Sequence, residues 1–189
     1  MTALELYQQS TDKQRILITG SGSKLIASLV AHALKFHKRN FDLAYSDNII
    51  SISEQSPVII IESDTKLIDY KHHILVLGSS ASNELLSQLE QLADATPKGG
   101  TIIYPKSHSA LNKIGSKERT DVQAIPYEVY KHDTAEGKTV LISSTKERFP
   151  VELSGEAELI CASAAKELLK KIGISSGQFY KAISAYKAA

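Results

Sequence analysis

The stretch Arg15-Ile-Leu-Ile-Thr-Gly-Ser-Gly-Ser-Lys-Leu-Ile-Ala-Ser-Leu-Val30 decides the fold of this 189-residue chain. An apolar run without alternation, Ile16 to Thr19, is typical of a strand that is covered on both faces. Apolar residues then recur at helical spacing from Leu25 to Leu34, which predicts an amphipathic helix. Only small residues and one lysine lie between the two patterns. The stretch therefore predicts a buried strand, a tight loop and a helix in direct succession.

The same alternation continues along the chain. Further apolar runs of four residues lie at 58–61, 74–77, 101–104 and 139–142. Helical stripes lie at 85–93, at about 156–171 and from about residue 176 onward. Strands that alternate with helices predict right-handed crossovers and an α/β fold. We therefore expect a doubly wound, mostly parallel sheet, ending in a pair of helices.

Residues Asp121 to Leu153 show a different pattern. Three short strand-like runs are separated by turn signals at Asp133 and at Glu136-Gly137. Such spacing predicts hairpins rather than crossovers, and hence a small antiparallel extension of the sheet. No repeat or linker divides the sequence, so we expect residues 1–189 to form one domain.

Composition excludes several classes of function. Lys plus Arg number 22 and Asp plus Glu 21, so a net charge of +1 provides no general field for nucleic acid or an anionic membrane. No apolar run approaches the roughly 20 residues that span a bilayer, and the N-terminal segment lacks the apolar core of a secretory signal. The single cysteine excludes an internal disulfide and a cysteine-based zinc site. We expect a cytoplasmic protein that binds neither nucleic acid nor membrane.

The loop after the first strand has the composition of a phosphate-binding site. Its residues are Thr19, Gly20, Ser21, Gly22, Ser23 and Lys24. Small residues let the backbone approach an anion, the following helix N-terminus favours negative charge, and Lys24 can neutralise a phosphate. A full loop of this kind has Gly before the lysine and Ser or Thr after it, whereas this chain has Ser23 and Leu25. Leucine has no oxygen with which to bind Mg²⁺.

Two other interpretations of this loop stay open. The loop is also compatible with a plain strand-to-helix turn that leaves Lys24 in solvent. A dinucleotide-binding fingerprint fits less well, because its third glycine is missing and only Asp47 is available as the acidic residue after the second strand.

Glu62 and Asp64 are candidate metal ligands. They follow the buried run 58–61, and the carboxyl ends of parallel strands are where such sites lie. A solvated start of a loop explains them equally well.

Other polar and aromatic residues give no clear site. His72 and His73 are adjacent and should point in opposite directions on an extended chain, so they should not share a metal. Lys166, Lys170 and Lys171 are expected on an exposed helix face. The tyrosines are too scattered in sequence to form a stacking platform: Tyr7, Tyr127, Tyr130, Tyr180 and Tyr186.

From about Arg15 to Lys187 the chain resembles the central, ATP-binding domain of the Mur ligases, the amino-acid and peptide ligases of cell-wall synthesis. The muramate–alanine and murein-peptide ligase branch looks closest. Thr19, Gly20 and Lys24 match the family's I-T-G-T-x-G-K-T loop, and Glu62 and Asp64 match its strand ending in E-x-D-E. Residues 97–104 are similar to the P-x-G-G strand. Gly155, Ala164 and Ala165 match the motif L-x-G-x-H-N-x-x-N-x-x-A-A.

The departures from the family fall on residues that carry chemistry. Leu25 replaces a metal ligand, residues 78–80 lack the acidic site that follows the third family strand, and Glu158 and Cys161 replace polar asparagine positions. The family's flanking sugar-nucleotide and amino-acid domains are also not recognisable. Ligation through an acyl phosphate needs Mg²⁺ and lysine to neutralise phosphoryl charge. The resemblance therefore implies a degenerate domain with impaired catalysis, in which ATP and Mg²⁺ bind weakly or not at all.

Three functional hypotheses follow. The first is a degenerate Mur-ligase-like nucleotide-binding domain with a regulatory or interaction role linked to peptidoglycan metabolism, acting with a protein partner or as a homodimer. The second is an active ATP-dependent ligase component, of the acid–amino-acid type, that works with a separate chain and uses Lys24, Glu62 and Asp64. The third is a protein-interaction module that binds no ligand. The sequence assigns no catalytic residue.

Overall fold

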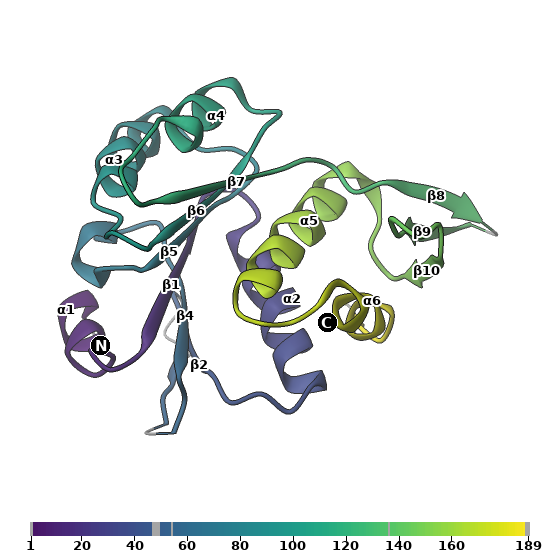
Figure 1. Cartoon of the computed structure of the whole chain (residues 1–189), viewed down its shortest axis with the longest axis horizontal. Helices are drawn as coiled ribbons and strands as arrows, with labels where there is room; N and C mark the ends of the chain where they lie inside the picture. The colour runs from purple at the N-terminus through teal and green to yellow at the C-terminus, as the bar shows by residue number, and fades with distance from the viewer. Residues whose placement is uncertain (1, 47–49, 54, 136, 188–189) are drawn as a thin grey trace.

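A computed structural model describes residues 2–46, 50–53, 55–135 and 137–187 of the chain. Within these residues the centre of the fold is a seven-stranded sheet with the strand order β3-β2-β4-β1-β5-β6-β7 (Figure 1). The strands are β1 (Gln14–Thr19), β2 (Asp42–Tyr45), β3 (Ile50–Ser51), β4 (Val58–Glu62), β5 (Ile74–Leu77), β6 (Thr101–Pro105) and β7 (Gln123–Tyr127). All neighbouring pairs from β2 to β7 are parallel, and the short β3 pairs antiparallel with β2. The predicted α/β class and mostly parallel sheet are confirmed.

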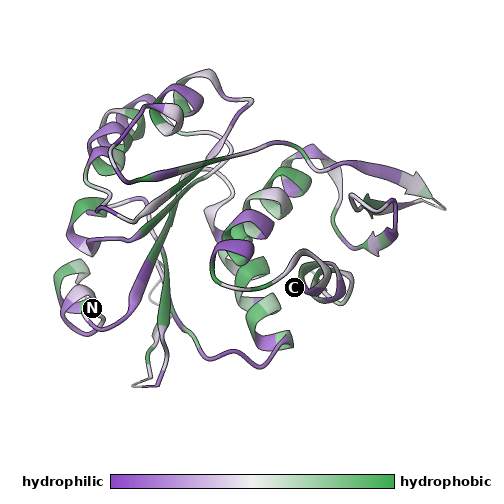
Figure 2. Ribbon diagram, in the orientation of Figure 1, coloured by the Kyte–Doolittle hydropathy of each residue, from purple (hydrophilic) through white to green (hydrophobic). Residues whose placement is uncertain are grey.

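Helices cover both faces of this sheet (Figure 1). One face carries α1 (Ala3–Gln8), the 3-10 helix η1 (Leu67–Tyr70), α3 (Asn83–Asp94) and α4 (Ser109–Ser116). The other face carries α2 (Ser23–Phe36), α5 (Gly155–Lys171) and α6 (Ser176–Ser184). The β1 side chains alternate between the two resulting cores, with Ile16 and Ile18 under α2 and Leu17 under α3. This explains the continuous apolar run, which Figure 2 shows as hydrophobic strands in the middle of the fold.

Helix α2 packs on β1 and β4 and against both α5 and α6, while α5 packs beside it on β6 and β7. Its buried residues include Ile26, Leu29, Val30 and Leu34. His32 and His37 each bring a ring nitrogen to 2.9 Å from a backbone carbonyl of α6. No helix in the described part of the chain combines the length and the apolar character needed to cross a membrane.

A second, three-stranded antiparallel sheet extends beyond the main sheet (Figure 1). It consists of β8 (His132–Ala135), β9 (Lys138–Ile142) and β10 (Arg148–Val151), in the order β10-β9-β8. The predicted antiparallel extension is confirmed, but the expectation of hairpins throughout Asp121 to Leu153 is wrong. Residues 123–127 instead form β7, which follows the crossover helix α4 and pairs in parallel with β6. Pro126 lacks a backbone donor, and its place on an edge strand tolerates that loss.

Candidate functional site

The predicted loop lies where β1 ends and α2 begins. Gly20 and Gly22 have backbone φ angles of 91° and 83°, in the left-handed region that favours glycine. Gly22 is the N-cap residue of α2, and Ser23 and Lys24 open its first turn. The backbone therefore turns into the helix as the sequence predicts, with Lys24 exposed at the helix N-terminus.

Asp64 is hydrogen-bonded to the start of this loop. Its Oδ1 accepts the Thr19 hydroxyl and the Gly20 backbone N–H, both at 2.7 Å. One carboxylate oxygen thus occupies two donors that the loop would otherwise offer to an anion. A phosphate at the same donors would have to displace Asp64 and overcome its negative charge.

Glu62 is hydrogen-bonded to the end of the loop, at the first residue of α2. Glu62 is only 3% exposed, and its Oε1 accepts a hydrogen bond from the Ser23 hydroxyl at 2.7 Å. Its Oε2 accepts from the Ser46 hydroxyl at 2.9 Å and from the Ser46 N–H at 3.3 Å. A buried carboxylate requires such donors. Glu62 therefore connects the ends of β4 and β2 to the first residue of α2.

A second loop, residues 78–80 after β5, lies directly against the first. The Gly78 N–H donates to the Thr19 carbonyl at 2.7 Å, and the Ser79 N–H donates to the Ser21 carbonyl at 2.9 Å. The Ser21 N–H in turn donates to the Ser80 carbonyl at 2.8 Å. Strands β1 and β5 are neighbours whose helices, α2 and α3, cover opposite faces, so this is a topological switch point. Ligands of open α/β sheets bind at such points, but here the two loops close the crevice with their own hydrogen bonds.

The side chain that follows the lysine is directed away from the loop. Leu25 is partly buried and packs against the apolar core between the sheet, α2 and α5. Cys161 of α5 lies behind Gly22, where an added Cβ would come within 2.5 Å of its sulfur. Burial, reinforced by the nearby Glu158, raises the pKa of the Cys161 thiol to about 11, which keeps it protonated at neutral pH. Both residues contribute packing rather than polar atoms to this site.

A shallow hollow of about 350 Å³ opens beside the loops. Gly20, Ser21 and Ser80 are among the residues that line it, together with Asp64 and Glu84. Among the described residues, no three His, Cys, Asp or Glu side chains are grouped so that they could hold a metal ion. Glu62 and Asp64 both reach the predicted loop, but each is hydrogen-bonded to a different part of it. Their role as metal ligands stays a prediction, and Asp47 lies outside the described residues.

Sequence reasoning missed several of these contacts. Ser46 gave no signal, because a lone serine after a short strand has no distinguishing pattern. Residues 78–80 were identified only by the chemistry that they lack, although a glycine directly after a buried strand is a recognised sign of close backbone approach. The adjacent histidines do point apart: His72 contacts Thr96, and His73 contacts Arg15.

Lys170 and Lys171 are exposed as expected, but the expectation for Lys166 is wrong, and two of the tyrosines form a contact that the sequence did not predict. Tyr130 and Tyr180, which are 50 residues apart in sequence, meet with their hydroxyl oxygens 2.5 Å apart. Lys166 does not lie on an exposed helix face but is half-buried, with its ammonium 5.0 Å from the centre of the Tyr130 ring. Sequence spacing could not show either contact, because β7, α5 and α6 are brought together only by the tertiary fold.

The fold that these elements build is one that solved ligases share. Among solved structures, the chain is similar to UDP-N-acetylmuramate:L-alanyl-gamma-D-glutamyl-meso-diaminopimelate ligase from Neisseria meningitides (TM-score 0.78, 16% identity), with 99% of this chain and 70% of that chain covered. It is also similar to MurF from Acinetobacter baumannii (TM-score 0.79, 11% identity), with 99% and 49% covered. An FPGS–AMPPCP complex matches at a TM-score of 0.71 and 12% identity, with 98% and 67% covered.

These similarities concern the fold, since every identity is low. The chain spans about half the length of MurF and about two thirds of the other two chains. No family model and no curated protein sequence matches the chain. The structural neighbours therefore confirm the Mur-ligase-like fold that the sequence resemblance implies.

Proposed function

We propose that this chain is a Mur-ligase-like nucleotide-binding domain that binds a nucleotide phosphate weakly at residues 19–24 and does not catalyse ligation. One observation carries the proposal: a glycine loop and a helix N-terminus lie at the switch point of the sheet, with Lys24 in the first helical turn. Loops of this geometry bind phosphate through backbone N–H groups and the helix dipole.

The weakness of binding follows from the contacts of the loop. Asp64 holds the Thr19 and Gly20 donors, and the loop after β5 holds the Ser21 donor. A phosphate gains these donors only by breaking existing hydrogen bonds. Each such exchange reduces the net binding free energy by about 1 kcal/mol.

The loss of catalysis follows from the metal-binding groups. Ligation through an acyl phosphate needs Mg²⁺ close to the transferred phosphoryl group. Leu25 offers no oxygen and packs into the core, while Ser23 and Glu62 already bind each other. The residues present therefore suit a phosphate better than a metal, and we expect nucleotide binding to depend little on Mg²⁺.

Thermal shift with ADP, ATP and AMP-PNP, with and without Mg²⁺, tests this proposal. A ligand that binds only the native state raises the melting temperature. We expect a small shift with each nucleotide that Lys24→Ala removes. Asp64→Asn keeps an acceptor oxygen but removes the charge, so it should strengthen binding about tenfold. Lys35→Ala, at the opposite end of α2, is the matched control and should leave binding unchanged.

A clear outcome against the proposal is the absence of a shift in both wild type and Asp64→Asn. The chain would then be an interaction module that binds no nucleotide. Its place in peptidoglycan metabolism, as a regulatory subunit or partner of a ligase, is part of the same proposal. The link to peptidoglycan metabolism rests on the murein-peptide ligases among the fold neighbours.

A second candidate is an active ligase component, favoured by the meeting of Glu62 and Asp64 at the Lys24 loop. Phosphate release from ATP in the presence of Mg²⁺ tests it. ATP turnover that is lost in Lys24→Ala and kept in Lys35→Ala would establish this candidate. The proposal that the chain does not catalyse ligation would then be wrong. Turnover equal in wild type and Lys24→Ala would exclude it.

A further inference from the structure

A second concave site lies on the other part of the molecule, between the end of β7, the end of β9, α5 and α6. Its volume is about 410 Å³, within the range of small-molecule sites. We refer to it as the tyrosine–lysine groove, because its lining includes Tyr130, Lys131, Ser143, Lys146, Lys166 and Tyr180. None of its lining residues lines the hollow beside the glycine loop.

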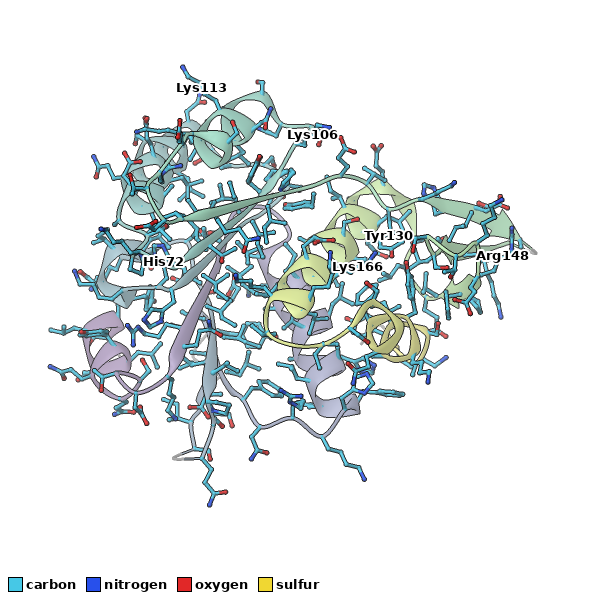
Figure 3. All side chains as sticks on the ribbon, in the orientation of Figure 1. His72, Lys106, Lys113, Tyr130, Arg148 and Lys166 are labelled. Atoms are coloured by element: carbon cyan, nitrogen blue, oxygen red, sulfur yellow. The ribbon has the colours of Figure 1, made fainter. Side chains whose placement is uncertain are left out.

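Lys166 is held in a fixed position in this groove. Its ammonium lies 5.0 Å from the centre of the Tyr130 ring and 5.4 Å from that of Tyr180, and it is 3.5 Å from the Tyr180 hydroxyl. Figure 3 shows Lys166 reaching from α5 toward Tyr130. Cation–π contacts of this kind orient an ammonium without neutralising it. Lys166 therefore presents a full positive charge with little conformational freedom left to lose.

The aromatic side of the groove is equally well ordered. The hydroxyls of Tyr130 and Tyr180 share a hydrogen bond of 2.5 Å, and Phe149 stacks on the Tyr180 ring at a centroid distance of 4.4 Å. Burial, together with this hydrogen bond, raises the pKa of Tyr130, so its phenol stays protonated. The groove thus combines closely packed aromatic rings with the protonated hydroxyl of Tyr130.

The balance of charge in the groove is positive. Its two carboxylates are paired with lysines that do not line it: Glu167 with Lys170 at 2.8 Å and Glu128 with Lys106 at 3.1 Å. Across residues 2–46, 50–53, 55–135 and 137–187, no carboxylate lies within ion-pair distance of the groove's three lysines, which are Lys131, Lys146 and Lys166. Three ammonium groups around one hollow raise the local concentration of anions.

We propose that the tyrosine–lysine groove binds a small organic anion, whose carboxylate or phosphate meets Lys166 and its neighbouring lysines beside the exposed edges of Tyr130 and Tyr180. This site is separate from the proposed nucleotide loop. An anion here gains charge-assisted hydrogen bonds from the lysines, and an attached ring contacts only the small part of Tyr130 and Tyr180 that stays exposed.

Titration with phenyl phosphate and with benzoate, followed by two-dimensional NMR, tests this site and distinguishes the two anionic groups. Benzyl alcohol, which has the ring but no charge, is the ligand control. We expect at least one of the two anions to bind with millimolar affinity or better and to shift signals of Tyr130 and Tyr180. Benzyl alcohol should bind more weakly.

Lys166→Met keeps an unbranched stem and removes the charge, so it should weaken binding about tenfold. Lys181→Met on the exposed part of α6 makes the same change outside the groove and should have no effect. Lys24→Ala should also have no effect, which separates this site from the nucleotide loop. If Lys166→Met perturbs folding, Lys146→Met on the exposed turn after β9 serves instead.

Three results would overturn the proposal: no binding of either anion, equal binding by wild type and the groove variants, or shifts confined to the glycine loop. The last result would assign the anions to the loop and leave the proposed function standing. If the protein binds the anions in the groove but binds no nucleotide, the groove proposal stands and the proposed function is wrong.

Discussion

Gly78→Ala tests the closed crevice between the two loops. A Cβ at Gly78 would lie 2.3 Å from the Ser21 carbonyl oxygen, 2.8 Å from the Gly20 carbonyl carbon and 2.9 Å from the Ser21 nitrogen. All three are backbone atoms, so no rotation of a side chain can relieve the contact. The loop after β1 must move away from the loop after β5.

The cost can be worked out from the contacts that this movement breaks. Three backbone hydrogen bonds join the loops, and each contributes about 1 kcal/mol, which predicts a loss of about 3 kcal/mol in the free energy of unfolding. Overpacking of a filled site typically costs about 1–3 kcal/mol, which is consistent with this value. For a chain of this length, the melting temperature should fall by roughly 6–12 °C.

Urea denaturation followed by far-UV circular dichroism measures the loss, because the chain contains no tryptophan for fluorescence. Gly177→Ala is the matched control: its Cβ meets nothing within 4 Å and lies in helix α6. That variant should be as stable as wild type or more stable by about 0.5 kcal/mol. A Gly78→Ala protein within about 0.5 kcal/mol of wild type would refute the contact between the loops.

Three further predictions concern buried polar groups. Burial, and secondarily the neighbouring positive charges, lowers the pKa of His72 from 6.5 to about 4, so protonation favours the unfolded state. Stability from this group is complete above pH 6.5 and is lost as the pH falls toward 4. The free energy of unfolding, measured by denaturation, should fall between pH 7 and pH 5 in wild type. This fall should be about 2 kcal/mol larger in wild type than in His72→Gln. Ser23→Ala should lower the free energy of unfolding by about 2 kcal/mol, because the buried Glu62 loses a donor at 2.7 Å. Tyr127→Phe should cost about 1–2 kcal/mol, since its hydroxyl donates to the buried Leu77 carbonyl at 2.6 Å.

Each of these variants has a control that changes the same atoms elsewhere. The control for His72→Gln is His132→Gln, on an exposed strand, and the control for Ser23→Ala is Ser87→Ala, on an exposed helix face. The control for Tyr127→Phe is Tyr7→Phe, because the Tyr7 hydroxyl has no hydrogen-bond partner in the described part of the chain. The controls should stay within about 0.5 kcal/mol of wild type. A pH dependence that persists in His72→Gln would assign it to another group. If Ser23→Ala or Tyr127→Phe lowers the free energy of unfolding no more than its control does, the buried hydrogen bond of that residue does not stabilise the fold.

The centre of the fold could be predicted because both sheet faces are covered. Strand β5 and the part of β1 from Ile16 to Ile18 are continuously apolar, and this pattern can be recognised without knowing the neighbouring strands. Strand β2 was missed because it contains Asp42, which is fully buried and paired with Lys13 at 2.6 Å. A charge in a buried strand hides the apolar pattern, and its partner is 29 residues away. Helix α4 was missed because it is short and packs a glycine, Gly115, against Tyr104.

The candidate site was predictable to a similar extent. The glycine loop and the acidic strand end are local patterns, so sequence placed Lys24, Glu62 and Asp64 at one edge of the sheet. Which donors the carboxylates accept depends on the distances between strand ends, and these are set by packing. The occupied state of the Thr19 and Gly20 donors could therefore be seen only in three dimensions.

The position of α2 has a consequence for synthesis on the ribosome. Strands β1 and β4 cover one part of its apolar surface and helices α5 and α6 cover the rest, and about 120 residues separate α2 from α5. At a translation rate of about 5–20 residues per second, roughly 6–24 s pass before that cover emerges. During this interval Ile26, Leu29 and Val30 have no α5 or α6 to pack against. Nascent chains stalled before α5 should therefore be protease-sensitive within α2 and prone to self-association, and protection should appear only after α6 has left the exit tunnel.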